Sequence, residues 1–160
     1  MFDKYDQAWS KYHKKLKILP LPLISWGVFD YQNNELANFN AIQKKWINKE
    51  DYHKHIANKC VIITDSEFTI QFASKEISEL TGYQNYEVIG QSPKIFQGDL
   101  TSGITKNSIR RALSKHHPFK EIILNYKKDG TTYWCEIEAY PKFDDKNNLV
   151  NYIAFERIAS

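Results

Sequence analysis

Residues 72–100 read FASKEISELTGYQNYEVIGQSPKIFQGDL, and the fold of the chain is decided in this stretch. Its apolar residues recur at short helical steps that are broken at Thr81 and Gly82, so the pattern predicts two brief helices rather than one long helix. Asn85 is expected to cap the second of them. A short helix is not stable in water by itself and must pack on another element. We therefore expect these helices to lie on a β-sheet, where they would form the floor of a pocket.

Strand-like runs lie on both sides of this stretch. They are short segments rich in β-branched and aromatic residues, and they are expected at Cys60–Thr64, Phe68–Ala73, Glu121–Tyr126, Thr132–Ala139 and Leu149–Glu156. A longer helix is expected at Thr105–Leu113. Helices laid across one face of an antiparallel sheet enclose a concave compartment. The sequence thus predicts an α+β fold, in which a five-stranded antiparallel sheet carries short helices on one face.

The composition is that of an ordinary globular chain. Of its 160 residues, 42% are hydrophobic and 26% are charged, which is enough to bury a core in one domain. The formal net charge of +3 is too small to indicate nucleic acid as a partner. No apolar run approaches about 18 residues, and the first residues are charged throughout. We therefore expect a cytoplasmic protein with neither a membrane span nor a signal peptide.

Residues 1–57 precede the strand-rich region and are expected to form a helical extension. Along its first part, large apolar residues recur at intervals of three and four and stop before Pro20: Phe2, Tyr5, Trp9, Tyr12, Leu16 and Leu19. A second helix is expected at Glu35–Ile47, with Leu36, Phe39, Ile42 and Trp46 on one face. The aromatic face of the first helix either packs on the domain's own sheet or forms a dimer interface, and both alternatives stay open.

Several short motifs in a fixed order carry a resemblance to a known family. After the first strand come DSEFTIQFAS, ELTGY, EVIG, SPKIFQG, a helix ending in IRRAL, NYKKDGTTYW and the closing strand YIAFERI. In this order and spacing the chain resembles a PAS sensory domain, and within that family it is most similar to the flavin-binding light-oxygen-voltage (LOV) branch. The resemblance covers residues 58–160, so residues 1–57 would lie outside the PAS domain as a cap or a dimerisation element.

The resemblance implies a site for the phosphate end of a flavin. In LOV domains the stretch corresponding to GQSPKIFQG reads GxNCRFLQG, and its cysteine bonds to the flavin after light absorption. Pro93 stands at that position, which implies that the usual photoadduct cannot form there. Lys94 replaces an arginine but keeps its positive charge, while Gln97 and Arg110 match the family's residues.

The residues that the resemblance assigns to the flavin ring are less well kept. Asn125 matches an asparagine that hydrogen-bonds the pyrimidine edge, but Cys135 replaces a second asparagine, and a thiol is a weak donor. Glu156 replaces a glutamine, and a buried carboxylate is costly unless it is protonated or paired. The resemblance implies FMN or FAD as cofactor, with an unknown small ligand or no ligand as the alternatives. A thiol that reacts with the ligand is a sharper hypothesis for Cys135, but a lone strand cysteine is more often a small buried hydrophobe.

The histidines give no metal site. His53 and His55 form an HxH pair that could supply two ligands, but no cysteine or acidic cluster at ligand spacing completes the set. His116 and His117 precede a strand, where histidines of a surface loop are expected. We therefore expect no metal.

Two interpretations of function stay open. The first is a sensory module that binds a small ligand and signals through contacts with another chain. The alternative is a ligand-free PAS module for interaction and dimerisation, with a core filled by its own aromatic side chains. No paired-carboxylate, Ser/His/Asp or phosphate-loop pattern is present, so we do not expect an enzyme. The expected partners are a second copy of the chain and a separate signalling protein, with no nucleic acid and no membrane.

Overall fold

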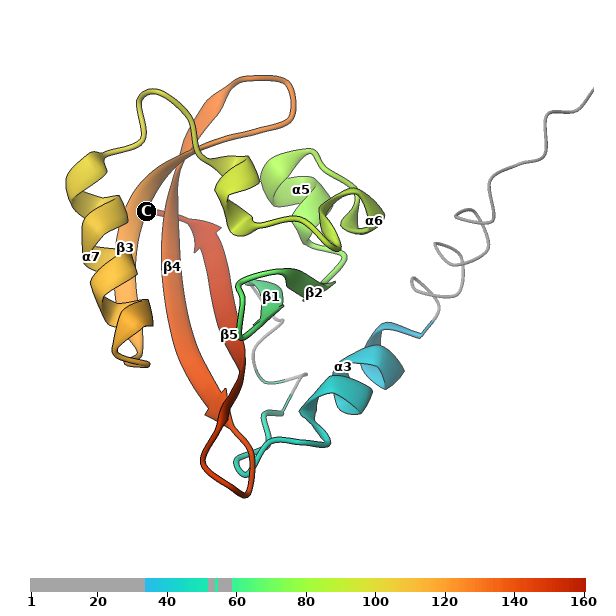
Figure 1. Ribbon diagram of the computed structural model, residues 1–160. Coiled ribbons are helices and arrows are strands. Elements are labelled where there is room, and N and C mark those ends of the chain that lie inside the picture. The colour runs from blue at the N-terminus through green and yellow to red at the C-terminus, as the bar shows by residue number, and fades with distance from the viewer. Residues whose placement is uncertain (1–33, 52–53, 55–58) are drawn as a thin grey trace, which may run out of the picture. The chain divides into compact units, whose positions relative to one another are not determined.

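A curved antiparallel sheet organises the protein in the computed structural model, which describes residues 34–51, 54 and 59–160 (Figure 1). Its strands are β1 (Cys60–Asp65), β2 (Ile70–Ala73), β3 (Phe119–Tyr126), β4 (Thr132–Phe143) and β5 (Leu149–Ile158). They lie in the order β2-β1-β5-β4-β3, and every neighbouring pair is antiparallel. The predicted α+β fold with a five-stranded antiparallel sheet is therefore confirmed.

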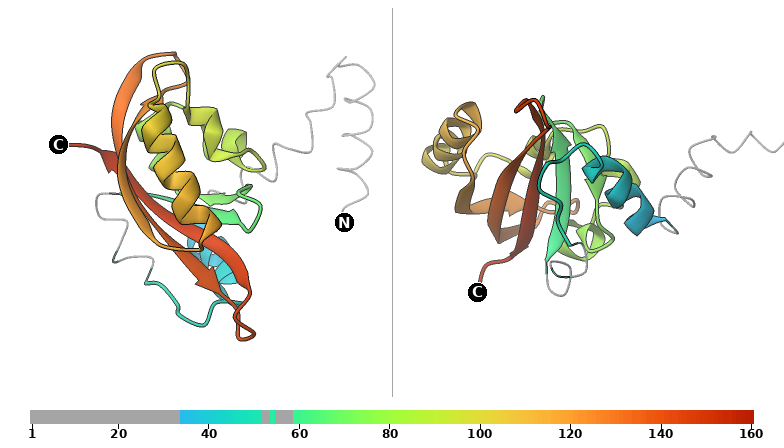
Figure 2. Two further views of the ribbon diagram at one scale, coloured as in Figure 1. Left: turned by 60° about the vertical axis from the view of Figure 1, so that its left-hand side comes forward. Right: turned by 90° about the horizontal axis from the view of Figure 1, so that it is seen from below.

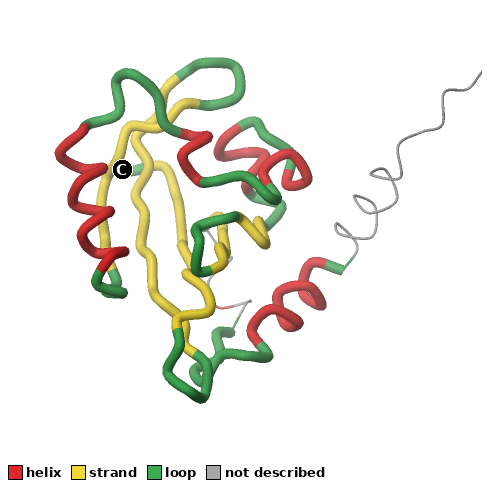
Figure 3. Tube along the Cα trace, in the orientation of Figure 1, coloured by secondary structure: helices red, strands yellow, loops and turns green. Residues whose placement is uncertain are grey.

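Five helices, most of them short, lie beside this sheet in the described part of the chain (Figures 1 and 3). They are α3 (Glu35–Gln43), α5 (Ile77–Thr81), α6 (Asn85–Val88), the 3₁₀ helix η1 (Pro93–Phe96) and α7 (Gly103–Ser114). In the view of Figure 2 from below, α7 lies at the β3 end of the strand order and α3 lies at the opposite end. The helices between β2 and β3 pack on the sheet as the sequence predicts, since a cluster of buried apolar residues joins them to the strands.

The break between the first two short helices of the core lies where the sequence predicts it. Gly82 ends α5 with φ at +77°, a left-handed conformation that glycine adopts without strain. The predicted cap of α6 is wrong, because Asn85 is the first helical residue and Gln84 precedes it as the cap. The Glu87 carboxylate accepts a hydrogen bond of 2.9 Å from the Gln84 backbone N–H, as in a capping box.

The hairpin between β1 and β2 begins and ends later than expected. The Asp65 carboxylate accepts backbone hydrogen bonds of 2.9 Å from Glu67 and Thr69, and Phe68 between them has a φ of +64°. This turn uses residues 65–69, so β2 starts at Ile70 instead of Phe68. At the other end of the sheet, β4 continues beyond Ala139 because its last residues still pair with the start of β5.

Residues 34–51, the segment before the core, pack against one face of the sheet, and the helices between β2 and β3 cover the other face. Side chains alternate between the two faces along a strand, and Asn151 on β5 therefore lies on the opposite face from Tyr152. Trp46 donates a hydrogen bond of 2.8 Å from Nε1 to the Asn151 Oδ1 atom, and Phe39 packs edge to face on Phe72 at 5.7 Å. Helix α3 ends at Gln43, so Trp46 reaches its buried position from a turn rather than from the predicted longer helix.

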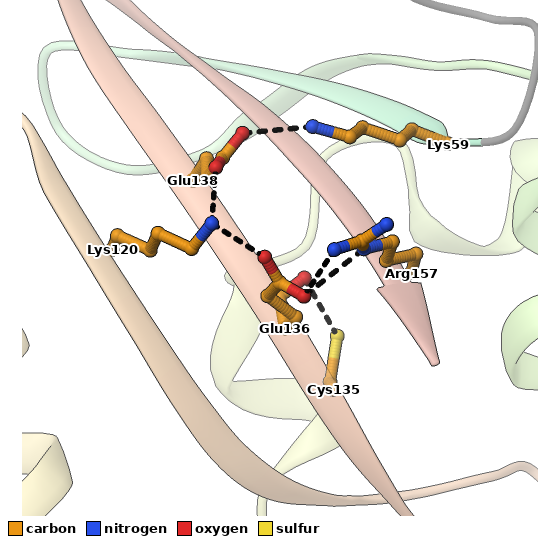
Figure 4. A network of polar contacts seen from close by, with 6 residues as sticks. All are labelled: Lys59, Lys120, Cys135, Glu136, Glu138 and Arg157. Atoms are coloured by element: carbon orange, nitrogen blue, oxygen red, sulfur yellow. Dashed lines mark hydrogen bonds and ion pairs between the residues drawn. The ribbon is translucent and has the colours of Figure 1, made fainter. Parts of the chain in front are cut away.

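A charged network covers the same face at the β4 strand (Figure 4). Glu138 pairs with Lys59 at 2.8 Å and with Lys120 at 2.7 Å, while Glu136 pairs with Lys120 at 2.7 Å and with Arg157 at 2.7 Å. These contacts join β3, β4, β5 and the residue before β1. The lysine contacts explain why the pKa of Glu138 is lowered to about 2.

The first predicted helix, at residues 2–19, lies outside the described residues, as do His53 and His55. From Asn34 onward the chain forms one compact unit. Among the described residues, no helix is both long and apolar enough to cross a membrane.

Candidate ligand-binding site

A cavity of about 490 Å³ lies between the sheet, η1 and α7. This volume is within the range of small-molecule sites. Its polar and charged lining comes from several elements and consists of Thr64, Ser66, Glu67, Ser92, Lys94, Gln97, Lys106, Arg110, Ser114, His116, Asn125 and Glu156. Most of the remaining lining is apolar, with Ile62, Phe96 and Ile137 among the residues that contribute it. The compartment expected from helices laid on a sheet is therefore present.

The exposed side of the cavity is basic. Lys94 comes from η1, Lys106 and Arg110 come from one face of α7, and His116 follows that helix. Within the described part of the chain, no acidic side chain forms an ion pair with Lys94, Lys106 or Arg110. Among the described residues, the one side chain that Arg110 hydrogen-bonds is Asn107, through a long bond of 3.3 Å to Oδ1. This side of the cavity can therefore receive an anionic group.

The inner side of the cavity is polar but buried. Asn125 on β3, Glu156 on β5 and Thr64 on β1 line it with exposed fractions of 3%, 4% and 6%. Among the described residues, the Thr64 hydroxyl has no hydrogen-bond partner. Buried polar groups are normally hydrogen-bonded. A ligand with hydrogen-bonding atoms at its inner end would satisfy this hydroxyl.

Glu156 is the most unusual of these inner groups. Its Oε2 atom lies 3.6 Å from the Cys135 thiol, and burial raises the pKa of the carboxyl to about 7. Cys135 itself is fully buried and does not line the cavity. The Cys135 thiol lies beside Glu156, behind the lining of the cavity, and the assignment of Cys135 to a ligand stays a prediction.

Neither cysteine is placed to act as an exposed nucleophile. Burial raises the pKa of the Cys60 thiol well above its usual value, and the nearby Glu156 carboxyl adds to this effect. Burial and the same carboxyl also raise the pKa of the Cys135 thiol. Because the thiolate is the reactive form, these raised pKa values disfavour reaction of the two thiols near neutral pH. Cys60 also lies outside the cavity lining, in the apolar core.

Pro93 takes the place in η1 that the resemblance assigns to the LOV cysteine. It is the first residue of the 3₁₀ helix and lines the cavity. Proline suits this position because the first turn of a helix leaves its N–H groups without intrahelical partners. Ser92 before it accepts a hydrogen bond of 3.5 Å from the Lys94 N–H. The sequence at η1 therefore favours the start of the helix, and η1 itself contains no cysteine.

The structure brings most of the predicted site residues together. Lys94, Gln97, Arg110, Asn125 and Glu156 line the same cavity, and Cys135 does not. Of the stretch at residues 72–100, only its η1 part reaches the cavity, while α5 and α6 pack on the apolar core. The sheet, rather than these two helices, is thus the floor.

Sequence reasoning missed seven polar lining residues: Thr64, Ser66, Glu67, Ser92, Lys106, Ser114 and His116. Lys106 could have been found, because residues four apart share a helix face and it precedes Arg110 by four. The sequence predicts His116 only as a histidine of a surface loop, and it is indeed exposed there, with a φ of +54° that turns the chain after α7. Within the described ranges, no three His, Cys, Asp or Glu side chains group as metal ligands.

A comparison with known proteins agrees with this fold. A family model described as "PAS domain" matches residues 58–157, and the chain belongs to this family. The chain is 35% identical over 98 residues to Protein TWIN LOV 1 of Arabidopsis thaliana, and 34% identical over 92 residues to the blue-light photoreceptor of Listeria monocytogenes. These matches cover 59% and 56% of this chain, but only 25% and 36% of those two relatives.

Solved structures of LOV domains have the same fold. The dark structure of the LOV domain of the blue-light photoreceptor aureochrome 1 is 30% identical, with a TM-score of 0.63, over 71% of this chain and 88% of that one. A LOV domain studied with a flavin analogue is also 30% identical, with a TM-score of 0.62, over 65% of this chain and 79% of that one. The protein is thus a PAS domain with LOV domains among its relatives, and relatives of this kind are signalling sensors.

Proposed function

We propose that this chain is a sensory PAS module that holds a flavin, FMN or FAD, in its cavity and signals through contacts with another protein chain. The observation that carries the proposal is the division of one cavity into two ends. Lys94, Lys106 and Arg110 supply cations without acidic partners among the described residues, and Asn125 and Glu156 supply buried hydrogen-bonding groups. An amphipathic molecule with a phosphate at one end and a heterocycle at the other matches this division.

The residues present fit such a ligand in charge and in hydrogen bonding. Arg110 and Lys94 would bind the phosphate, because charge-assisted hydrogen bonds to phosphate are stronger than neutral ones. Gln97, Asn125 and the Thr64 hydroxyl would meet polar atoms of the ring, and the apolar lining would exclude water from it. Bound flavin would supply blue-light absorption or redox chemistry. The chain's own residues would orient the ligand and keep solvent away.

The proposed sensor works without a bond between a cysteine and its ligand. Pro93 takes the place of the nucleophile in η1, and the buried thiols of Cys60 and Cys135 have raised pKa values and lie outside the lining. A change in the ligand's light or redox state would instead reach the sheet through hydrogen bonds. Signalling requires that the two states bind the partner chain with different affinity. A second copy of the chain and a separate signalling protein are the proposed partners.

Titration of the full chain with FMN and with riboflavin, followed by quenching of flavin fluorescence, tests this proposal. We expect both to bind, and we expect Arg110→Gln to weaken FMN binding by about 10-fold, the scale of one charge-assisted hydrogen bond. Riboflavin has no phosphate, so its affinity should stay the same in this variant. Arg111→Gln is the matched control, because Arg111 is exposed on the same helix and does not line the cavity.

Failure of both flavins to bind would reject the flavin proposal and favour the ligand-free interaction module. If Arg110→Gln and Arg111→Gln weaken FMN binding equally, the phosphate is attracted by the general positive charge of this surface and makes no specific contact with Arg110. Mass spectrometry of the illuminated, flavin-loaded protein should give the unmodified chain mass. A mass increased by one flavin would contradict the absence of a cysteine bond.

A further inference from the structure

We propose that Glu156 makes this cavity take up a proton together with its ligand, so that the site selects ligands whose inner end is uncharged and accepts a hydrogen bond. This inference rests on the proposed function and extends it to the regulation of the same site. It would make occupancy of the sensor depend on pH near neutrality. The position of one carboxyl group among its neighbours carries the inference.

The geometry around Glu156 favours a neutral carboxyl. The residue is 4% exposed, and its side chain lines the inner side of the cavity from β5. Its one hydrogen-bond partner among the described side chains is the Cys135 thiol, at 3.6 Å. No ion pair joins Glu156 to a cation anywhere in the described part of the chain. A buried carboxylate without a cation is unfavourable, and such a group binds a proton instead.

The titratable neighbours of Glu156 supply no positive charge. Cys60 lies beside it on β1, and Tyr133 and Cys135 come from β4; all three have raised pKa values and stay neutral near pH 7. Asn125 faces the cavity from β3 and does not titrate. On its own strand, Arg157 points to the opposite face, where it pairs with Glu136.

The other charged and titratable side chains of the cavity come from the other elements around it. They are Lys94 of η1, Lys106 and Arg110 of α7, the imidazole of His116 after α7, and Glu67 of the β1–β2 turn. Lys94, Arg110, His116 and Glu67 are exposed, and Lys106 is half-buried, whereas Glu156 is buried. The cationic end therefore holds the anionic part of a ligand and leaves Glu156 without a counter-charge. Burial accordingly raises the pKa of Glu156 from 4.5 to about 7.

A ligand that fills the cavity would strengthen this preference. It displaces water from the inner end, and desolvation disfavours the charged form of a carboxyl. The protonated carboxyl offers one O–H donor and one acceptor oxygen, whereas the carboxylate offers acceptors only. An uncharged ring with an acceptor atom therefore binds the protonated form better. By linkage, its affinity falls as pH rises through the pKa of Glu156.

Riboflavin is the probe that isolates this effect, because the phosphate of FMN titrates near pH 6 by itself. Its dissociation constant for the full chain would be measured by fluorescence quenching near pH 6 and near pH 8. If only the protonated form binds, the fraction of competent protein falls about 10-fold between these two values, and the affinity falls with it. In Glu156→Gln, which carries no titrating group there, we expect the same affinity at both pH values.

Two further measurements test whether Glu156 is the group that takes up the proton. His116→Gln should keep the pH dependence, which would show that the exposed histidine is not its source. Calorimetric titration of the wild-type chain near pH 7.5, in two buffers with different heats of ionisation, should reveal net proton uptake on binding. This second measurement does not depend on the folding of any variant.

The outcomes separate this inference from the function on which it rests. Riboflavin binding with equal affinity near pH 6 and pH 8 and no proton uptake would overturn the role of Glu156 and leave the flavin sensor standing. A pH dependence that persists in a folded Glu156→Gln variant, or disappears in His116→Gln, would also overturn it. Absence of flavin binding at every pH would overturn both.

Discussion

Trp46 Nε1 donates a hydrogen bond of 2.8 Å to Asn151 Oδ1, which joins two residues that are 105 positions apart in the sequence. Asn151 in turn donates from its Nδ2 atom to the Thr64 carbonyl oxygen at 2.9 Å. Lys142 lies over the Trp46 ring at 5.2 Å from its centroid. Trp46, in the segment before the core, thereby contacts β4 and β5 directly and is linked to β1 through Asn151.

Replacement of Trp46 by Phe should lower the free energy of unfolding by about 1–3 kcal/mol, the cost of a buried polar atom without its partner. The Asn151 Oδ1 atom would be that atom, because the bond to Thr64 uses only the amide nitrogen. Denaturant unfolding followed by circular dichroism measures the change. Trp134→Phe is the control, since Trp134 is 56% exposed and its replacement should change stability by less than about 0.5 kcal/mol. Equal losses in the two variants would contradict the role of this bond.

Glu156 should make the protein less stable as pH rises. Its pKa is raised from 4.5 to about 7, so between these values the folded state binds more protons than the unfolded state. The contribution of Glu156 to the free energy of unfolding is therefore fully present below about pH 4.5 and is lost as pH rises through 7. For a pKa shift of this size, the contribution amounts to roughly 3 kcal/mol. Glu156→Gln should remove that loss. Unfolding curves measured between about pH 5 and pH 8 test it, and parallel profiles of wild type and variant would reject it.

Glu138 should have the opposite dependence on pH. Contacts with Lys120 and Lys59 lower its pKa to about 2, so its contribution to stability is present above about pH 4.5 and is lost as pH falls toward 2. Because Lys120 is well exposed, water and salt screen the interaction, and Glu138→Gln should cost less than about 1 kcal/mol near pH 7. Added salt should shrink this difference further. A difference that grows on acidification would contradict the assignment.

Gly98 should not tolerate a side chain. A Cβ atom there would lie 2.6 Å from the Tyr126 Cε2 atom, and the Tyr126 hydroxyl is held by a hydrogen bond of 3.0 Å from the Leu100 N–H. Gly98→Ala should therefore destabilise the protein by about 1–3 kcal/mol, as other overpacked positions do. Gly103→Ala is the matched control, because nothing lies within 4 Å of the added Cβ atom. Thermal unfolding distinguishes them, and equal midpoints would show that the Tyr126 ring moves away freely.

Local patterns predict the sheet and the break between α5 and α6 well, since both depend on neighbouring residues. The run CVIIT specifies a strand, and the glycine after Thr81 specifies a turn, whatever the rest of the chain packs against them. The end of α3 is different. Trp46 continues the helical spacing of Phe39, but its indole finds a partner on β5, and this distant contact ends the predicted helix early. The predicted cap of α6 is wrong for a local reason, because the Glu87 carboxylate accepts a hydrogen bond from the Gln84 N–H three residues before it.

The candidate site likewise has features that the local sequence predicts and features that depend on residues far away in the chain. Alternation along β4 and β5 predicts which side chains share the helix-covered face, and this places Cys135 and Glu156 on one side. Which of them reaches the cavity depends on where η1 and α7 stand above the sheet, and the strand sequence does not contain that information. Spacing on α7 would have identified Lys106 beside Arg110, since both belong to the same helical face.

Helix α7 has no fully buried residue along its 12 residues. Its apolar side chains Ile109 and Leu113 line the cavity together with Lys106 and Arg110. Ile109 also packs against the core cluster, but Leu113 faces the cavity. Whatever fills the cavity would then complete the hydrophobic contacts of this helix. Its backbone amides should exchange with heavy water much more slowly in the filled protein than in the empty one, and α7 would be the part of the fold whose opening reports occupancy.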